Sequence, residues 1–302
     1  MTAITAANIN ASREARPRRL EPGALMIVPA LLWLVLFGVV PMILLGCMSL
    51  WRSTIFGIET EWNLDNYRTI FSDDVYMRVL AQTLRIALAS TVLSLILSYP
   101  LAYFLASAKG RKKTALVLLV FLPFWTSYVI RSYVWLPMLG RQGLVNQVLL
   151  WLGVVDAPID WFLFNEGTVY LGLVYVYMLF MTLPIYLSLD RLDPKLVEAA
   201  NDLGARPAQT FVRVVLPLSM PGVLSGCTMV FLLACGVYVT PQLLGGPSAV
   251  MFGNIIASQF LTSNNWALGA ALSVILVVLV LGCLYLAGLR WGLQRLFMGA
   301  GH

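Results

Sequence analysis

Six long apolar runs, separated by more polar segments, dominate the pattern of this sequence. They cover residues 25–50, 86–107, 114–139, 168–189, 218–244 and 267–289. A helix needs about 20 mostly apolar residues to cross the hydrocarbon core of a bilayer. The pattern therefore predicts an all-α polytopic membrane protein with six transmembrane helices.

The composition agrees with a membrane protein, because 60% of the residues are hydrophobic and only 11% are charged. Soluble domains carry about a quarter charged residues. The first run follows four arginines, is too long for the core of a signal peptide and is not followed by a small-x-small cleavage site. We therefore expect an uncleaved anchor, a tail at 1–24 and a single transmembrane domain at 25–302.

The positive charges are distributed unevenly between the polar segments. If the N-terminus is cytoplasmic, 14 of the 20 lysines and arginines fall in cytoplasmic segments, whereas the outer loops hold four, with eight acidic residues. Cytoplasmic loops of membrane proteins carry an excess of Lys and Arg. This bias predicts that both termini and the loop at 190–217 lie in the cytoplasm.

Several kinds of chemistry lack the residues they need. The one histidine is the last residue, His302, and the four cysteines lie in apolar runs without a C-x-x-C pair, so a metal site and histidine-based catalysis are not expected. The phosphate-binding pattern G-x-x-x-x-G-K-[ST] is absent. The apolar runs contain no Asp or Glu, which argues against a proton-coupled carrier.

A charged segment before the fifth run predicts two short helices joined by a turn. Asp193 and Pro194 are favourable as N-cap and first residue, Gly204 can end the helix in a left-handed conformation, and Pro207 opens a second helix that Pro217 bounds. Helices this short are marginal alone, so they need a packing surface. The alternatives are a connector on the lipid surface, packing on the membrane domain, or docking to another protein.

The same segment resembles the EAA loop of the permeases of ATP-binding-cassette (ABC) importers. The resemblance rests on Glu198-Ala199-Ala200, Gly204, Phe211 and Leu216-Pro217, and on their position before the penultimate span. Further stretches resemble the B-type permeases of spermidine/putrescine importers: residues 124–127, 130–133, 143–146, 243–246, 253–256, 259–260, 266 and 269–271. This family implies a type I importer fold in a bacterial inner membrane and transport of a small solute, most readily a polyamine or related cation.

The resemblance also implies the partners and the coupling residues. It implies a cytoplasmic ABC ATPase dimer that holds the ATP and Mg, a second related permease and an extracytoplasmic binding protein, with no cofactor or catalytic residue on this chain. In the loop, Leu203 and Phe211 are expected as apolar docking knobs, Gly204 as the bend, and Glu198 and Arg206 as charged contacts. The full expected set is Glu198, Ala199, Ala200, Leu203, Gly204, Arg206, Phe211, Leu216 and Pro217.

Two regions are candidates for the translocation pathway. Arg131, near Tyr128 in the third run, costs about 2.5–3.5 kcal/mol at membrane depth, and it either snorkels, pairs structurally or serves the pathway. At the end of the fifth run, Tyr238, Thr240 and Gln242 stand among helix-breaking residues, followed by Asn254. They either line the path or belong to a turn that caps the helix.

Two alternatives remain open on the sequence alone. The G-x-x-x-G pair Gly222 and Gly226 permits a close helix approach, either to a partner permease or within the chain. The whole chain could instead work as a stand-alone secondary transporter or channel, and an intramembrane enzyme is a more distant possibility because the chain lacks an internal histidine and a G-x-S-x-G motif. The identity of the protein partners separates these classes.

Overall fold

A computed structural model describes residues 22–54 and 57–291. The expected N-terminal tail at 1–24 falls almost entirely outside this part. The chain divides into two compact units, Met1–Cys47 and Met48–His302. The first contains α1 (Pro22–Leu34), the π-helix η1 (Val35–Val39) and nearly all of α2 (Val40–Met48). They form a helix whose apolar part, Val28–Met48, is long enough to span a membrane, as the first apolar run predicts.

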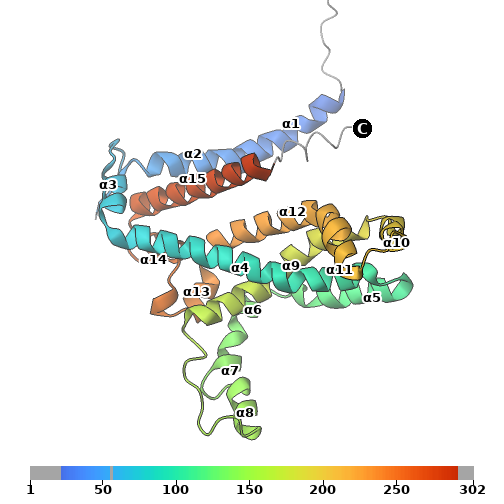
Figure 1. The fold of residues 1–302 in the computed structure, drawn as a ribbon. Coiled ribbons are helices and arrows are strands. Elements are labelled where there is room, and N and C mark those ends of the chain that lie inside the picture. The colour runs from blue at the N-terminus through green and yellow to red at the C-terminus, as the bar shows by residue number, and fades with distance from the viewer. Residues whose placement is uncertain (1–21, 55–56, 292–302) are drawn as a thin grey trace, which may run out of the picture. The chain divides into compact units, whose positions relative to one another are not determined.

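The second unit is a bundle around three long helices, α4 (Asp74–Ser107), α9 (Glu166–Asp190) and α12 (Leu216–Cys235), which pack on one another (Figure 1). Small polar residues let α4 approach closely: Ser90, Ser94 and Ser98 are fully buried. The Ser98 hydroxyl donates a hydrogen bond of 3.1 Å to the Met178 carbonyl of α9. Such bonds and close packing are what hold helices together in lipid.

Shorter elements surround this bundle. The helix α15 (Trp266–Trp291) packs on α14 (Phe252–Leu261) and α3 (Asp65–Ser72). An antiparallel hairpin of β1 (Arg52–Thr54) and β2 (Gly57–Glu59) is an exception to the predicted all-α fold. It is tied to α15 because the Ala267 amide donates to the Ser53 hydroxyl at 3.0 Å.

Five helices are long and apolar enough to cross a membrane, and a sixth span exists only if a bent pair is counted as one. The predicted third span, 114–139, is wrong as a single rod. The helix α5 (Gly110–Phe121) and the 3-10 turn η2 (Leu122–Trp125) end at an 87° bend, before α6 (Tyr128–Tyr133), α7 (Trp135–Leu139) and α8 (Leu144–Trp151). Pro123 lacks an amide donor and so weakens the helical hydrogen bonds just before the bend, and Thr126 then takes an extended backbone conformation (φ −76°, ψ 154°).

Two other predicted spans have different limits. The helix α4 begins at Asp74 rather than 86, because the Asp73 side chain caps it by accepting the Val75 amide at 2.9 Å. The predicted fifth span, 218–244, is broken: α12 ends at Cys235, and α13 (Val239–Leu244) and the 3-10 turn η4 (Pro247–Ala249) follow separately.

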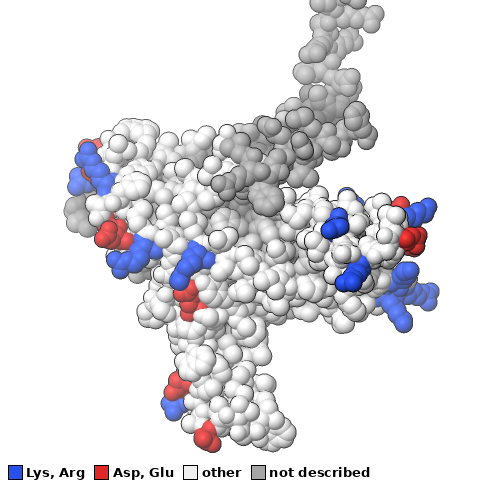
Figure 2. Space-filling model, viewed as in Figure 1, with Lys and Arg blue, Asp and Glu red and all other residues white. Residues whose placement is uncertain are grey.

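Charged side chains are unevenly distributed over the face seen in Figure 2. Charged side chains gather near α3 and the start of α4, near α10 (Pro194–Asp202) and the start of α5, and near α7 and α8. The surface between these groups carries few charges, as a surface in contact with hydrocarbon requires.

Candidate functional site

The turn between the two short helices of the loop has a defined geometry. The Asp193 side chain accepts the Lys195 amide at 3.0 Å, which caps α10 as the sequence predicts. Gly204 has a φ of 81°. Its amide bonds to the Asn201 carbonyl at 2.9 Å, and the Ala205 amide bonds to the Ala200 carbonyl at 3.1 Å. This pair of bonds is the Schellman motif that ends a helix and satisfies its last carbonyls.

The second short helix is not separate from the following span. The helix α11 (Pro207–Thr210), the π-helix η3 (Phe211–Val215) and α12 form one continuous helix, Pro207–Cys235. The prediction that Pro217 bounds a short helix is therefore wrong. The Leu216 amide bonds to the Phe211 carbonyl across a wide π-turn. Such a turn accommodates the missing amide of a proline without breaking the helix.

Phe211 packs inward, not toward solvent. Its ring makes edge contacts with Tyr99 and Tyr103 of α4, at centroid distances of 5.6 and 6.2 Å. The Tyr99 hydroxyl also lies 2.9 Å from the Ser219 hydroxyl of α12. The ring that is expected as a docking knob therefore packs against the bundle itself, and its contact with another protein stays a prediction.

Most of the other expected residues lie on the solvent-exposed side of the loop. Leu203 is 89% exposed at the turn. Glu198, Ala199, Arg206 and Pro217 are exposed as well, while Ala200 and Leu216 are half-buried. Leu203 therefore stands exposed beside charged residues, Glu198 and Arg206, that form no ion pair within 22–54 and 57–291.

At the break after α12, Thr240 and Tyr128 hold helices together. Thr240 is completely buried, and its hydroxyl lies 2.9 Å from the Tyr128 hydroxyl and 3.1 Å from the Ser132 hydroxyl. These contacts fasten α6 to α13. The expectation that Thr240 lines an open pathway does not fit its burial.

Three other expected residues meet at one cavity. Asn254 donates hydrogen bonds to the Tyr238 carbonyl at 2.9 Å and to the Gln242 side-chain oxygen at 3.0 Å, and so ties α14 to α13. Beside them opens a cavity of about 760 Å³. Its lining is uncharged: Tyr238, Pro241, Gln242, Gly246, Pro247, Val250, Asn254, Ile255, Ala257, Ser258, Gln259, Leu261 and Thr262.

Arg131 lies apart from this cavity, in an aromatic cluster at the 87° bend. Its guanidinium carbon is 5.0 Å from the centroid of the Phe124 ring. Its Nε and Nη1 atoms are buried and have no hydrogen-bond partner in the described part of the chain. The stacking of a guanidinium on an aromatic face favours the structural interpretation of this residue.

The close approach predicted for Gly222 and Gly226 occurs within the chain. A Cβ atom at Gly222 would lie 2.4 Å from the Pro184 carbonyl oxygen, and one at Gly226 would lie 2.9 Å from the Met181 sulfur. Both glycines therefore let α12 press against α9. A contact with another subunit is not needed to explain them.

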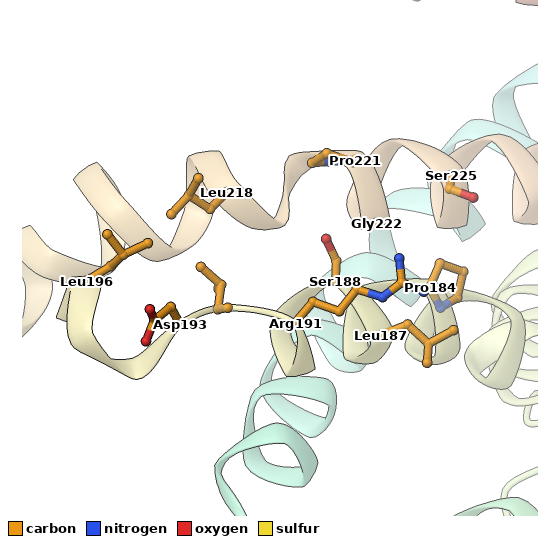
Figure 3. Close-up of a pocket in the computed structure, with 11 residues that line it drawn as sticks. Pro184, Leu187, Ser188, Arg191, Asp193, Leu196, Leu218, Pro221, Gly222 and Ser225 are labelled. Carbon is orange, nitrogen blue, oxygen red and sulfur yellow. The ribbon is translucent and has the colours of Figure 1, made fainter. Parts of the chain in front are cut away.

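The sequence analysis missed a second cavity, of about 650 Å³, between the end of α9 and the start of α12 (Figure 3). Its polar members are Ser188, Arg191, Asp193 and Ser225. In the sequence, the sign of this cavity would have been an arginine directly after the last residue of a span, but such arginines are common at cytoplasmic helix ends. Only the fold shows that Arg191 lines a cavity.

The chain matches known transport proteins over most of its length. Residues 98–297 match the family model described as binding-protein-dependent transport system inner membrane component. The chain is 40% identical to the spermidine/putrescine transport system permease protein PotB of Escherichia coli, over 90% of this chain and 97% of that protein. It is 39% identical to PotB of Haemophilus influenzae, over 82% and 86% of the two chains.

A solved structure has the same fold. It is a chain of a bacterial alginate ABC transporter in complex with an alginate pentasaccharide-bound periplasmic protein. The TM-score is 0.68 at 19% sequence identity, and the match covers 90% of this chain and 93% of that chain. At this identity the likeness concerns the fold alone.

Proposed function

Because this chain belongs to the family of binding-protein-dependent transport system inner membrane components, we propose that it is a permease subunit of an ABC importer for polyamines. It is a multi-pass inner-membrane protein. The 40% identity to PotB across nearly the full length of both chains supports spermidine and putrescine as the substrate class. The chain supplies the membrane passage, and a separate subunit hydrolyses ATP.

The orientation of the chain follows from its charge distribution. With both termini in the cytoplasm, the loop at 190–217 meets the cytoplasm and the cavity at Tyr238 opens toward the outer side. The 14 of 20 basic residues that then lie inside support this orientation. If the bent pair is counted as one span, the resulting six spans would be consistent with both termini on one side.

The observation that carries the proposed function is the rigid loop with its exposed Leu203. The turn is fixed by the Schellman bonds, α11 continues directly into α12, and Leu203 stands free at 89% exposure. A cytoplasmic ATPase that receives Leu203 in a cleft, with Glu198 and Arg206 setting the register, would hold one end of a membrane-crossing helix. ATP and Mg would be bound by that ATPase.

The same connections suggest how movement of the loop reaches the substrate. A force on the loop would pass along the continuous helix Pro207–Cys235, and the Phe211 contacts would carry it to α4 through Tyr99 and Tyr103. At the far end, α12 leads into α13, which lines the cavity with Tyr238 and Gln242. We assign to this cavity a place on the path, where an aromatic face and amide oxygens suit an alkylammonium ion.

The remaining partners complete an alternating-access importer. A binding protein would deliver the substrate from outside, as the periplasmic protein accompanies the alginate transporter. A second, related permease would supply the other half of the passage. Closure of the ATPase dimer would open this passage outward, and ATP hydrolysis would return it to the inward-open form.

The test is uptake by proteoliposomes that contain the chain, the second permease and the ATPase. We expect radiolabelled spermidine to enter only with binding protein outside and ATP on the ATPase side. The matched control is an ATPase whose phosphate-loop lysine is replaced, which should abolish uptake while the complex stays assembled. Uptake by the chain alone without ATP would instead establish a secondary transporter.

A further inference from the structure

The bent third span leads into an arm, residues 128–164, that runs across the direction of the long helices. Its helical part, from α6 to α8, makes an angle of 87° with the segment Gly110–Trp125. Figure 1 shows α7 and α8 standing away from the bundle. Because Gly110–Trp125 lies alongside α4, which is long and apolar enough to cross the membrane, the arm must run nearly parallel to the membrane plane.

The depth of the arm follows from its contact with α9. The Trp135 ring of α7 meets the Tyr175 ring of α9 edge to face, with centroids 5.5 Å apart. Tyr175 lies about 22 Å from Asp190 along α9, at 1.5 Å per residue. The ion pair of Asp190 with Lys113 marks one edge of the hydrocarbon, since neither charge belongs inside it. The hydrocarbon is about 30 Å thick, so the base of the arm lies about 8 Å inside the far edge.

The helix α8 of this arm has one exposed apolar side. Leu144, Val148 and Trp151 recur at helical spacing and are 59%, 44% and 84% exposed. Asn146, on the opposite side, is fully buried. It donates to the Ile159 carbonyl at 2.9 Å and accepts the Ile159 amide at 2.8 Å. These bonds hold the following loop against that opposite side, so the apolar side is left uncovered by the described part of the chain.

The charges near α8 belong to the loop side. Asp160 lies in the loop and pairs with Arg141 at 3.3 Å, and the two side chains are 67% and 70% exposed. Asp156 is exposed in the same loop. The other charge of the arm, Arg131, is stacked on the Phe124 ring at the base. Charged groups are unfavourable in hydrocarbon, so the loop side must face headgroups and water, which turns the apolar side toward the acyl chains.

We propose that the arm lies in the membrane leaflet away from Asp190 and that lipid acyl chains cover its apolar side, at Leu144 and Val148. The depth of about 8 Å agrees with the roughly 5–10 Å to which interfacial amphipathic helices bury their apolar face. Trp151 and Trp161, 84% and 72% exposed, lie at the boundary, where tryptophan keeps its N–H among the headgroups. Position 151 therefore stays within reach of reagents from that side. Only the identification of this leaflet as the outer one rests on the proposed function.

The test is the depth of nitroxide labels on the full chain in liposomes. After replacement of the four native cysteines, Val148→Cys and Asp156→Cys are labelled. Power-saturation EPR then measures collisions with oxygen, which concentrates in acyl chains, and with a water-soluble nickel chelate. We expect the ratio of oxygen to nickel collisions to be about fivefold larger at position 148 than at position 156. Leu144→Cys should resemble Val148→Cys, because both positions face the same way.

The same labels in the complete importer complex distinguish lipid from a protein partner. These positions are exposed, so a label displaces no internal contact. If acyl chains cover the apolar side, oxygen collisions at position 148 stay the same when the second permease and the ATPase are present. A fall in these collisions would overturn the proposal in favour of a contact with another subunit. Nickel collisions as frequent at position 148 as at position 156 would overturn it in favour of an arm in water. Uptake is not measured, so failure here is separate from failure of the importer assignment.

Discussion

Leu203 and Phe211 lie in the same loop but in different environments, so only one of them is available for contact with another protein. Both were expected to face a partner, yet only Leu203 is free, while the ring of Phe211 lies against Tyr99 and Tyr103. A side chain already packed in its own chain gains little from binding elsewhere. The docking energy of the loop should therefore centre on Leu203.

Leu203→Asp should abolish binding of the ATPase without unfolding the chain. The side chain is 89% exposed, so its replacement removes no internal contact, while a carboxylate in an apolar cleft is strongly unfavourable. Co-purification of the ATPase measures the effect. Leu261→Asp, at a leucine that is 77% exposed near the other cavity, is the matched control and should retain the ATPase. Full retention by both variants would refute this docking role.

Gly204→Ala should impair uptake by straining the turn. Gly204 has a φ of 81°, and a side chain in the left-handed region costs about 1–2 kcal/mol. Nothing lies within 4 Å of the added carbon, so the effect is conformational. Gly153→Ala is the control, because Gly153 has a φ of 67° and equally open space in another loop. Equal uptake by the two variants would show that the turn geometry does not matter.

At the scale of elements, the bundle depends on the close contact of α12 with α9. Gly222→Ala should destabilise it by about 1–3 kcal/mol, because the new carbon would meet the Pro184 carbonyl oxygen at 2.4 Å. A lower thermal midpoint of the purified chain would show this. Gly236→Ala, where nothing lies within 4 Å, should leave the midpoint unchanged. An unaltered midpoint for Gly222→Ala would contradict the claim that the bundle depends on the close packing of α12 on α9.

Two prolines show where local sequence stops determining an element. Pro123 and Pro217 both stand in apolar surroundings, yet the first precedes an 87° bend and the second lies inside a continuous helix. The difference comes from distant contacts. Thr240 holds the helix after the bend, whereas the π-turn and the packing of Phe211 keep the second helix in line.

The whole molecule should have one orientation in the membrane. After replacement of the four native cysteines, Leu203→Cys should react with an impermeant maleimide only from the cytoplasmic side. Trp151→Cys, at a tryptophan that is 84% exposed, should react only from outside. Gel-shift labelling of intact cells and inverted vesicles distinguishes the two. The reverse labelling pattern would show the opposite orientation, in which the loop could not reach a cytoplasmic ATPase.

Much of this arrangement could be predicted from the sequence because its causes are local. Apolar length determines the spans, and Asp193 and Gly204 fix the ends of α10 through neighbouring amides. The roles of Thr240 and Arg191 could not be predicted in this way. The burial of Thr240 depends on Tyr128, which is 112 residues away, and Arg191 lines a cavity only because α12 closes over α9.

The bend after Trp125 has a consequence for how the chain is made. The segment Gly110–Trp125 extends over about 24 Å at 1.5 Å per residue, less than the roughly 30 Å of hydrocarbon, so it is a poor substrate for insertion as an independent span. Its continuation is held by Thr240, which the ribosome adds 112 residues after Tyr128. The bent segment therefore depends on later parts of the chain for its packing, first on Tyr175 of α9 and finally on Thr240 of α13.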